Sequence, residues 1–411
     1  MKKNFVFIVA LFFLNIAYSQ IVNIPDANFK NALVNTLCVA SGYLENPEWD
    51  ADVNNDGEIQ VTEAEAIVHL VISGQNINSL EGIEAFIGLK SLIIVFNNIT
   101  ELDLSNSPDL ENLNCSQNLI SSLNISQSPN LGYINCTSND LSELDVTQNI
   151  NLVELICYNN SIQNLDLSQN GNLDFLHAGE NELNGLNISQ NINLTGCYIE
   201  NNNISEIDLS QNILLRGLGI SNNNLNSLDT SNNPDLKYLI CYSNPIEGEL
   251  DLSHLYGGMY VLMCNNTLLS SLNIKNGDNI NLTRMWAQDN PNLTCIEVDD
   301  VSFANSQSCQ SSSGWCKDET AVYSEDCNLG TEEVLESQFV IYPNPAKDVL
   351  MIYNESMSEV TSIKVFDALG RLVLEQSNPS NQLDVSNLSS GLLFIQIETD
   401  DGSLVKKLIK D

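Results

Sequence analysis

Residues 131–139 read LGYINCTSN, and residues 152–160 read LVELICYNN. The two segments start 21 positions apart and share an apolar residue at the first and fourth places, Cys at the sixth and Asn at the ninth. The same 21-residue step carries an aliphatic residue through Leu102, Leu123, Leu144, Leu165, Leu186, Ile207 and Leu228. A fixed period of this length predicts a solenoid, in which each repeat is one coil stacked on the next.

A ladder of Asn residues marks the same turn of successive repeats. Its members are Asn97, Asn118, Asn139, Asn160, Asn181, Asn202, Asn223 and Asn244. A buried amide at such a turn satisfies backbone groups. The second half of each repeat, for example LNIS or LDLS followed by polar QN or NP, predicts a short inward-facing pair and a turn on the opposite edge. We count about ten copies between Ile67 and Cys295.

The composition limits the choice of partners. The 411-residue chain has 15 Lys and Arg against 53 Asp and Glu, a formal charge of -38. This excess opposes binding to a phosphate backbone, so we expect neither nucleic acid nor an anionic membrane as a partner. Divalent cations are the more natural ligands of such a surface, although the same charge also keeps a secreted protein soluble.

The N-terminus has the pattern of a secretory signal peptide. Lys2 and Lys3 are followed by an apolar run from Phe5 to Ile16 and by small residues before Gln20, so residues 1–19 are predicted to be removed. No other stretch has the roughly 18 apolar residues of a membrane-spanning helix. We therefore expect a mature protein without a transmembrane segment.

The cysteines fall into two groups. Six occupy inward positions of repeats and are predicted to be core-filling thiols: Cys115, Cys136, Cys157, Cys197, Cys241 and Cys264. Four crowd together after the repeats, which favours disulfides in a secreted chain. We expect Cys295 to pair with Cys327 and Cys309 with Cys316, although spacing leaves the other pairings open. Cys38 is left over.

A short amphipathic helix is expected near the mature N-terminus. Pro25 and Asp26 are helix-start residues, and Phe29, Leu33 and Leu37 follow at helical spacing.

The next segment, residues 52–63, reads DVNNDGEIQVTE and matches the calcium loop of an EF-hand. Ca²⁺ takes six to eight hard oxygens, which alternate positions of a tight loop aim at one point. The predicted ligands are Asp52, Asn54, Asp56, the carbonyl of Glu58, Gln60 and Glu63. Gly57 permits the sharp bend. Ca²⁺ is therefore the predicted structural cofactor, and the alternative is a metal-free Asn/Asp/Gly turn before a helix.

The outward positions of the predicted strands would form the presented surface, because strand side chains alternate between faces. Many of these positions are aromatic in a chain with only 7% aromatic residues. The candidate ligand-binding residues are Tyr133, Glu154, Tyr158, Phe175, His177, Tyr198, Glu200, Tyr238, Tyr242 and Trp286. We predict anchors for a protein or glycan partner. The alternative is aromatic cross-strand pairs that stabilise the sheet itself.

The sequence does not predict a catalytic role. Glu154, Glu180 and Glu200 lie on neighbouring repeats, and two carboxylates one or two strands apart would be separated by about 5–10 Å, which overlaps glycosidase geometry. The sequence has no H-E-x-x-H or G-x-S-x-G motif and no cleft-forming insertion. The predicted class is therefore a binding protein, with a passive structural or cell-coat protein as the main alternative and a glycoside hydrolase as the remote one.

Two regions resemble known families. The repeat core L-x-x-L-x-[LC]-x-x-N resembles leucine-rich repeats, and the Cys-containing 21-residue copies are similar to those of secreted Bacteroidetes proteins and of internalin J-type adhesion proteins. The all-β region from Phe339 resembles the type A C-terminal sorting domain of the type IX (Por) secretion system. Its matching motifs are Tyr342–Ala346, Asp367–Arg371, Leu388–Gly391 and Lys406-Lys407. Leu393 departs from the pattern, since members usually have Tyr there.

These resemblances imply a route and an architecture. The route is Sec export followed by outer-membrane translocation directed by the tail, so the type IX secretion machinery is an expected partner. The architecture is a mainly β leucine-rich-repeat solenoid with a short α-helical N-cap, a disulfide C-cap and a C-terminal all-β sandwich. The predicted segments are 1–19 signal peptide, 20–66 N-terminal cap, 67–294 repeats, 295–328 C-terminal cap, 329–338 linker and 339–411 sorting domain.

Overall fold

The computed structural model describes residues 20–42, 46–310, 313–327, 339–354, 360–377, 382–399 and 402–411. The predicted signal peptide and linker lie outside these ranges. The chain forms two compact units, Met1–Pro245 and Ile246–Asp411. Every helix in the described ranges is too short or too polar to cross a bilayer.

The first unit begins with a helical cap. Helix α1 spans Ala27–Asn35, and the Asp26 carboxylate caps it by accepting from the backbone N–H groups of Asn28 and Phe29. Phe29 and Leu33 are buried as expected. Leu37 is not on the apolar face: the helix ends at Asn35, and the Leu37 side chain is 62% exposed. Helix α2, Val61–Ala66, follows the predicted calcium loop.

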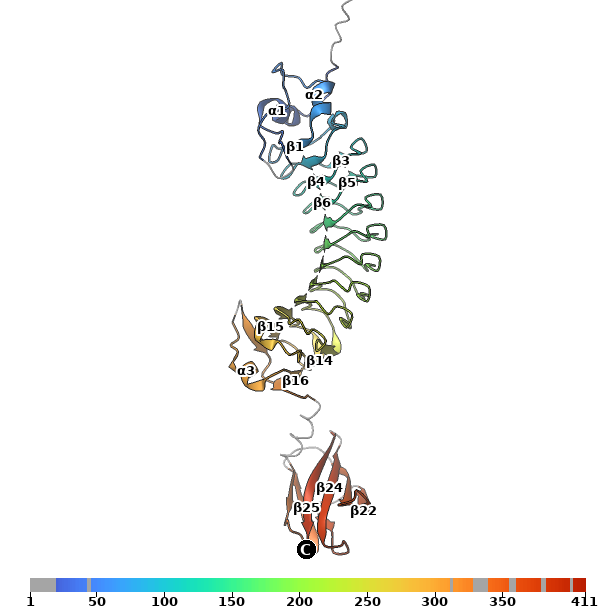
Figure 1. Ribbon diagram of the computed structural model, residues 1–411, viewed down its shortest axis with the longest axis vertical. Coiled ribbons are helices and arrows are strands. Elements are labelled where there is room, and N and C mark those ends of the chain that lie inside the picture. The colour runs from blue at the N-terminus through green and yellow to red at the C-terminus, as the bar shows by residue number, and fades with distance from the viewer. Residues whose placement is uncertain are drawn as a thin grey trace, which may run out of the picture. The chain divides into compact units, whose positions relative to one another are not determined.

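Each repeat of the first unit forms one coil, and successive coils lie side by side (Figure 1). The coils contribute three-residue strands to a parallel sheet, in the order β1 (His69–Val71), β2 (Ser91–Ile93), β4 (Asn112–Asn114), β6 (Tyr133–Asn135), β7 (Glu154–Ile156), β8 (Phe175–His177), β9 (Gly196–Tyr198), β10 (Gly217–Gly219) and β11 (Tyr238–Ile240). The middle residue of every one of these strands is fully buried, which confirms the predicted alternation of faces.

The opposite edge of the coils has less regular structure. The strands β3 (Glu101–Asp103) and β5 (Ser122–Asn124) pair in parallel there, and η1 (Ile83–Ala85) forms a short 3-10 turn. From β2 to β11 strand partners are 21 residues apart, for example Leu155 with Leu176, so equivalent side chains stack in register.

The predicted Asn ladder is confirmed. Asn139 donates from Nδ2 to the carbonyls of Cys115 and Cys136, at 3.1 and 3.0 Å, and its Oδ1 accepts from the N–H of Ile120 at 2.9 Å. One amide therefore joins its own turn to the previous coil. The residue before each Asn of the ladder from Asn97 to Asn244 has a positive φ, for example Glu180 at 50°.

A second Asn ladder supports the opposite edge, where the sequence predicts only a polar turn. Its members are fully buried: Asn149, Asn170, Asn191, Asn212 and Asn233. Asn170, for example, donates to the carbonyls of Val146 and Asn149, at 3.0 and 2.9 Å. Each coil of this region thus has an Asn side chain bonded to backbone carbonyls at both turns.

The six repeat cysteines and Cys38 are buried and free, as predicted. Burial in an apolar core disfavours the thiolate and raises the pKa of the Cys136 thiol to about 12. These thiols fill space in the core and are poor nucleophiles.

The second unit also begins with strands that pair in parallel. One sheet has the order β12 (Glu247–Asp251), β14 (Leu268–Asn273), β16 (Cys295–Glu297) and β18 (Val322–Ser324). Facing strands are β13 (Val261–Met263), β15 (Arg284–Ala287) and β17 (Gly314–Lys317), and the connections include η2 (Asn279–Asn281) and α3 (Val301–Ser306). Disulfides Cys295–Cys327 and Cys309–Cys316 form as expected.

The C-terminal region consists of two antiparallel sheets, which confirms the all-β prediction. One has the order β19 (Phe339–Tyr342), β20 (Val349–Asn354) and β23 (Gln382–Asp384). The other has the order β22 (Leu372–Ser377), β21 (Val360–Asp367), β24 (Gly391–Thr399) and β25 (Gly402–Lys410). Residues from both sheets share one buried core, including Leu350, Ile363, Ile395 and Leu408.

The first Asn ladder allows a direct test of coil stability. Asn139→Ala removes an amide that serves backbone groups of two coils, so we expect a loss of about 2–4 kcal/mol in the free energy of unfolding. Asn151→Ala is the matched control from the next repeat, because this exposed side chain makes one bond, to the carbonyl of Pro129. Urea denaturation of both variants is the measurement. Equal midpoints would contradict a structural role for the ladder.

Candidate functional site

Five of the predicted ligand-binding residues meet at strands β8 and β9 and in the segments that directly follow β7 and β9. The imidazole of His177 lies 4.8 Å from the ring of Tyr158 and 5.8 Å from that of Tyr198, measured between ring centroids. The ring of Phe175, from the same strand as His177, lies 5.6 Å from that of Tyr198. We call Tyr158, Phe175, His177, Tyr198 and Glu200 the aromatic cluster.

Glycines make room for these side chains. A Cβ atom at Gly217 would lie 2.5 Å from the Tyr198 hydroxyl oxygen, and one at Gly219 would lie 2.8 Å from the same ring. Gly196 similarly accommodates the ring of Phe175, and Gly179 the carboxylate of Glu200. Glycine in a strand often marks the close approach of another group. Sequence reasoning missed this role, although Gly at outward strand positions was a visible signal.

Glu200 is held by His177. Its Oε1 lies 3.0 Å from Nε2 of His177, and the two side chains are 24% and 29% exposed. Its Oε2 is buried and has no hydrogen-bond partner among the described residues. A half-buried carboxylate with one unused oxygen therefore lies beside two tyrosine rings.

Tyr158 is tied to a second carboxylate. Its hydroxyl donates a hydrogen bond to Glu180, and this bond raises the pKa of the phenol to about 12, with further contributions from burial and from the charge of Glu200. Glu180 itself occupies one of the left-handed turn positions. Glu180 thus extends the aromatic cluster from the turn after β8.

The remaining candidates are not part of this cluster. Burial, aided by Asp174, raises the pKa of Glu154. The side chain of Tyr133 hydrogen-bonds Asn135, and Tyr238 is 42% exposed. Tyr242 is half-buried. Trp286 belongs to the second unit, where the Arg284 guanidinium lies 5.1 Å from its ring centroid.

The predicted calcium loop has its donor residues close together. Asp52 accepts from the N–H groups of Asp56 and Gly57, and the side-chain amide of Asn54 donates to Asp56 and Gln60. Glu63 caps α2 by accepting from the N–H of Gln60, and also accepts from the N–H of Asn54.

The predicted metal ligands of this loop include amide and carbonyl oxygens as well as carboxylates. Within the described ranges, no three His, Cys, Asp or Glu side chains gather as a metal-holding group. The predicted set fits Ca²⁺ in its chemistry, because amide and carbonyl oxygens are common calcium ligands. The Glu58 side chain is engaged elsewhere, in an ion pair with Lys30, which leaves its predicted role to the backbone carbonyl.

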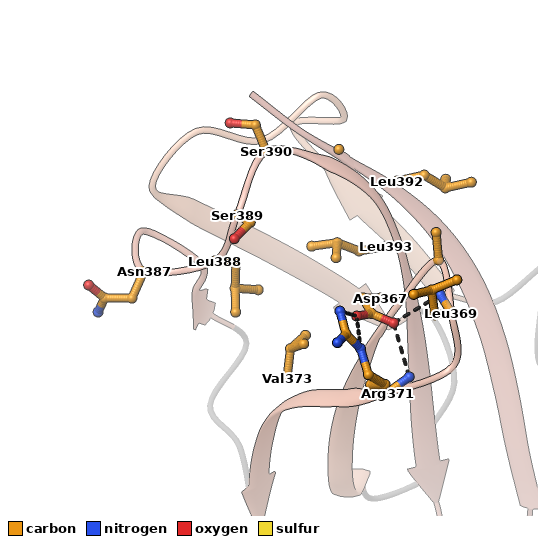
Figure 2. Close-up of a pocket in the computed structure, with 12 residues that line it drawn as sticks. Asp367, Leu369, Arg371, Val373, Asn387, Leu388, Ser389, Ser390, Leu392 and Leu393 are labelled. Atoms are coloured by element: carbon orange, nitrogen blue, oxygen red, sulfur yellow. Dashed lines mark hydrogen bonds and ion pairs between the residues drawn. The ribbon is translucent and has the colours of Figure 1, made fainter.

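Two motifs of the C-terminal region line one groove, drawn in Figure 2. On one side, the Asp367 carboxylate accepts from the N–H groups of Leu369 and Arg371 and from the Arg371 guanidinium. On the other side lies the Leu388–Gly391 segment. Leu369 is 80% exposed at the rim. Leu393, at the departure from the family pattern, is buried in the wall.

The Tyr342–Ala346 motif is hydrogen-bonded to the strand that carries the Lys406-Lys407 motif. Asn344 donates from Nδ2 to the carbonyl of Lys407 at 2.8 Å, and its Oδ1 accepts from the N–H of Ile409 at 2.9 Å. Ala346 also donates to the carbonyl of Ile409. The Tyr342–Ala346 motif is thereby fixed to the terminal strand that contains Lys406 and Lys407.

Residues 340–411 match the family of secretion system C-terminal sorting domains, which confirms the resemblance of the tail. A search of curated proteins finds no match to the chain.

Among solved structures, the functional domain of InlJ from Listeria monocytogenes, which includes a cysteine ladder, is 20% identical, with 95% of this chain and 98% of that chain covered and a TM-score of 0.45. An internalin, inlF, from the same organism is 22% identical, with 67% of this chain and 91% of that chain covered and a TM-score of 0.41.

The leucine-rich-repeat fold follows from the chain's own geometry, namely parallel strands 21 residues apart and the Asn ladder. Together with the sorting domain, this fold makes the chain a secreted leucine-rich-repeat protein.

The hydrogen bond between Tyr158 and Glu180 can be tested by titration. We expect the pKa of Tyr158 to lie at about 12, read from the 295 nm absorbance difference between the native protein and Tyr158→Phe. Glu180→Gln removes the negative acceptor that stabilises the neutral phenol, so the pKa should fall toward its ordinary value of about 10. Glu182→Gln, an exposed carboxylate two residues away, should leave it unchanged. An unchanged Tyr158 pKa in Glu180→Gln would contradict the hydrogen bond between Tyr158 and Glu180.

Proposed function

We propose that this secreted protein is a binding module that recognises a protein or glycan through the outward face of its parallel sheet. The sorting domain would deliver it by type IX secretion to the cell surface or the medium. The observation that carries the proposal is the aromatic cluster, in which large rings are held on an accessible face by closely fitting glycines.

The physical argument concerns pre-organisation. Rings that pack on one another and on the backbone lose little conformational freedom when a partner binds, so their contact area contributes efficiently to affinity. Cross-strand pairs alone would also stabilise the sheet. That structural role is compatible with binding, because Tyr158 and Tyr198 keep polar hydroxyl groups on the same face. A passive coat protein would make no use of this arrangement.

The calcium loop is a second proposal and concerns stability. We propose that Ca²⁺ binds at residues 52–63, with Asp52, Asn54, Asp56, Gln60, Glu63 and the Glu58 carbonyl as donors. Support comes from the clustering of these groups and from the position of the loop before α2. A bound ion would fix the cap that covers the first coil.

The binding proposal is tested with the mature protein on arrays of glycans and proteins. The triple change Tyr158→Ser, Tyr198→Ser and Tyr238→Ser should abolish the strongest signals, since buried aromatic anchors each contribute on the order of 1–2 kcal/mol, while the melting temperature falls only modestly. Tyr256→Ser is the control, because Tyr256 is 82% exposed and lies in the second unit. Binding that survives the triple change would place recognition elsewhere.

The calcium proposal is tested by thermal denaturation. Saturating Ca²⁺ at about 100 times the dissociation constant should stabilise the fold by about 2.7 kcal/mol, and chelator should reverse this. Asp52→Ala combined with Glu63→Ala should remove the calcium dependence, whatever its effect on the metal-free protein. The control pair is Asp140→Ala with Glu143→Ala, both exposed. A melting curve that does not respond to chelator would exclude the metal.

A further inference from the structure

The stretch of repeats that carries the aromatic cluster contains neither Lys nor Arg. Between Lys90 and Arg216, residues 91–215 include 15 Asp and Glu, one His, and neither Lys nor Arg. Such a long one-sign segment is unusual for a surface, which normally mixes both signs. The negative potential over this face is therefore not neutralised by the repeats that create it.

The carboxylates at the cluster make mainly neutral or aromatic contacts. Glu200 meets the imidazole of His177, and Glu180 accepts from the hydroxyl of Tyr158. Two ion pairs with Lys in the first unit, Lys30 with Glu58 and Lys90 with Glu111, involve other carboxylates. Glu180 is exposed and the Glu200 side chain is 24% exposed, so the negative charge of both carboxylates can attract a cation.

The rings add a second attraction for the same ligand. The rings of Tyr158 and Tyr198 both lie next to His177. The face of a tyrosine ring attracts Lys and Arg through the ring quadrupole. An Arg side chain can stack on such a ring while its N–H groups donate to a carboxylate. A neutral sugar would gain from the rings alone, and an anionic one would be repelled.

We propose that the aromatic cluster, together with Glu180, is a docking surface for a basic polypeptide, in which an Arg or Lys side chain of the partner seats against Tyr158 and Tyr198 between the two carboxylates. This inference rests on the proposed function and names the class of its partner. Association with such a partner is accelerated by the negative field and weakened by salt.

The probes are immobilised synthetic peptides of one Gly/Ser-rich sequence that contain Arg, Lys, citrulline or Glu at the same three positions, together with neutral and anionic oligosaccharides. We expect the full-length mature protein to bind the Arg and Lys peptides, with affinity that falls as salt rises. The citrulline and Glu peptides should bind about ten-fold more weakly or not at all, because they lack the cation.

Matched variants distinguish a specific binding site for the cation from nonspecific attraction by the acidic surface. Glu180→Gln with Glu200→Gln should weaken Arg-peptide binding about ten-fold or more. Glu182→Gln with Glu206→Gln removes the same charge from the same two repeats, at exposed positions outside the cluster, and should change it less than about two-fold. Melting temperatures establish that both double variants fold.

Several outcomes would overturn the inference. Equal losses of Arg-peptide affinity in the two double variants would mean that the peptide is attracted by the acidic surface in general. Equal binding of the Arg and citrulline peptides would mean that the positive charge is not recognised. If oligosaccharides bind the cluster and basic peptides do not, the face recognises glycans: the proposed function then stands and this inference fails. If no probe binds and the Tyr triple variant loses no array signal, both fail.

Discussion

The buried side-chain amide at each turn is the interaction on which the rest of the structure depends. A coil of 21 residues has strands of only three residues, so sheet hydrogen bonds satisfy a small part of its backbone. Asn139 and its equivalents supply the missing partners by bonding two carbonyls and one N–H group across neighbouring coils. Because an unpaired buried backbone group costs about 1–3 kcal/mol, this position is restricted in a way that the outward positions are not.

This difference between restricted inward positions and variable outward positions explains how a regular scaffold can present a specific surface. The inward Leu, Cys and Asn positions repeat because their environments repeat, whereas an outward position faces only its neighbours and solvent. At Gly217 and Gly219 the chain omits side chains so that Tyr198 can lie against the strand. The surface is therefore shaped by the side chains that the repeats omit as much as by the rings they display.

Periodicity in the sequence predicts the register of the strands, the inward thiols and the first Asn ladder, because each depends on a residue being equivalent to the one 21 positions away. The second ladder, at Asn170 and its equivalents, is not predicted, since a polar QN pair is ordinarily a solvated turn and only packing of the coils buries it. The prediction for Leu37 is wrong. Apolar residues continue at helical spacing in the sequence as far as Leu37, but the helix ends at Asn35 and the backbone at Thr36 is extended.

The candidate site is less predictable for a similar reason. Outward positions identify its residues individually, but ring contacts and the Tyr158–Glu180 hydrogen bond depend on side-chain directions that a period does not encode. The sequence marks Glu180 only as a carboxylate on a neighbouring repeat, since its position in a left-handed turn gives no hint that it reaches back to Tyr158.

The distribution of charge argues that acidity on this face serves more than solubility. Residues 20–339 contain 7 Lys and Arg against 43 Asp and Glu, whereas residues 340–411 contain 6 against 10. A need for solubility alone would apply to both regions, since both expose apolar side chains such as Ile192 and Leu369. The excess is instead carried mainly by residues 20–339, the region that includes the aromatic cluster. A field of one sign, placed where a partner would approach, selects partners by charge before any contact forms.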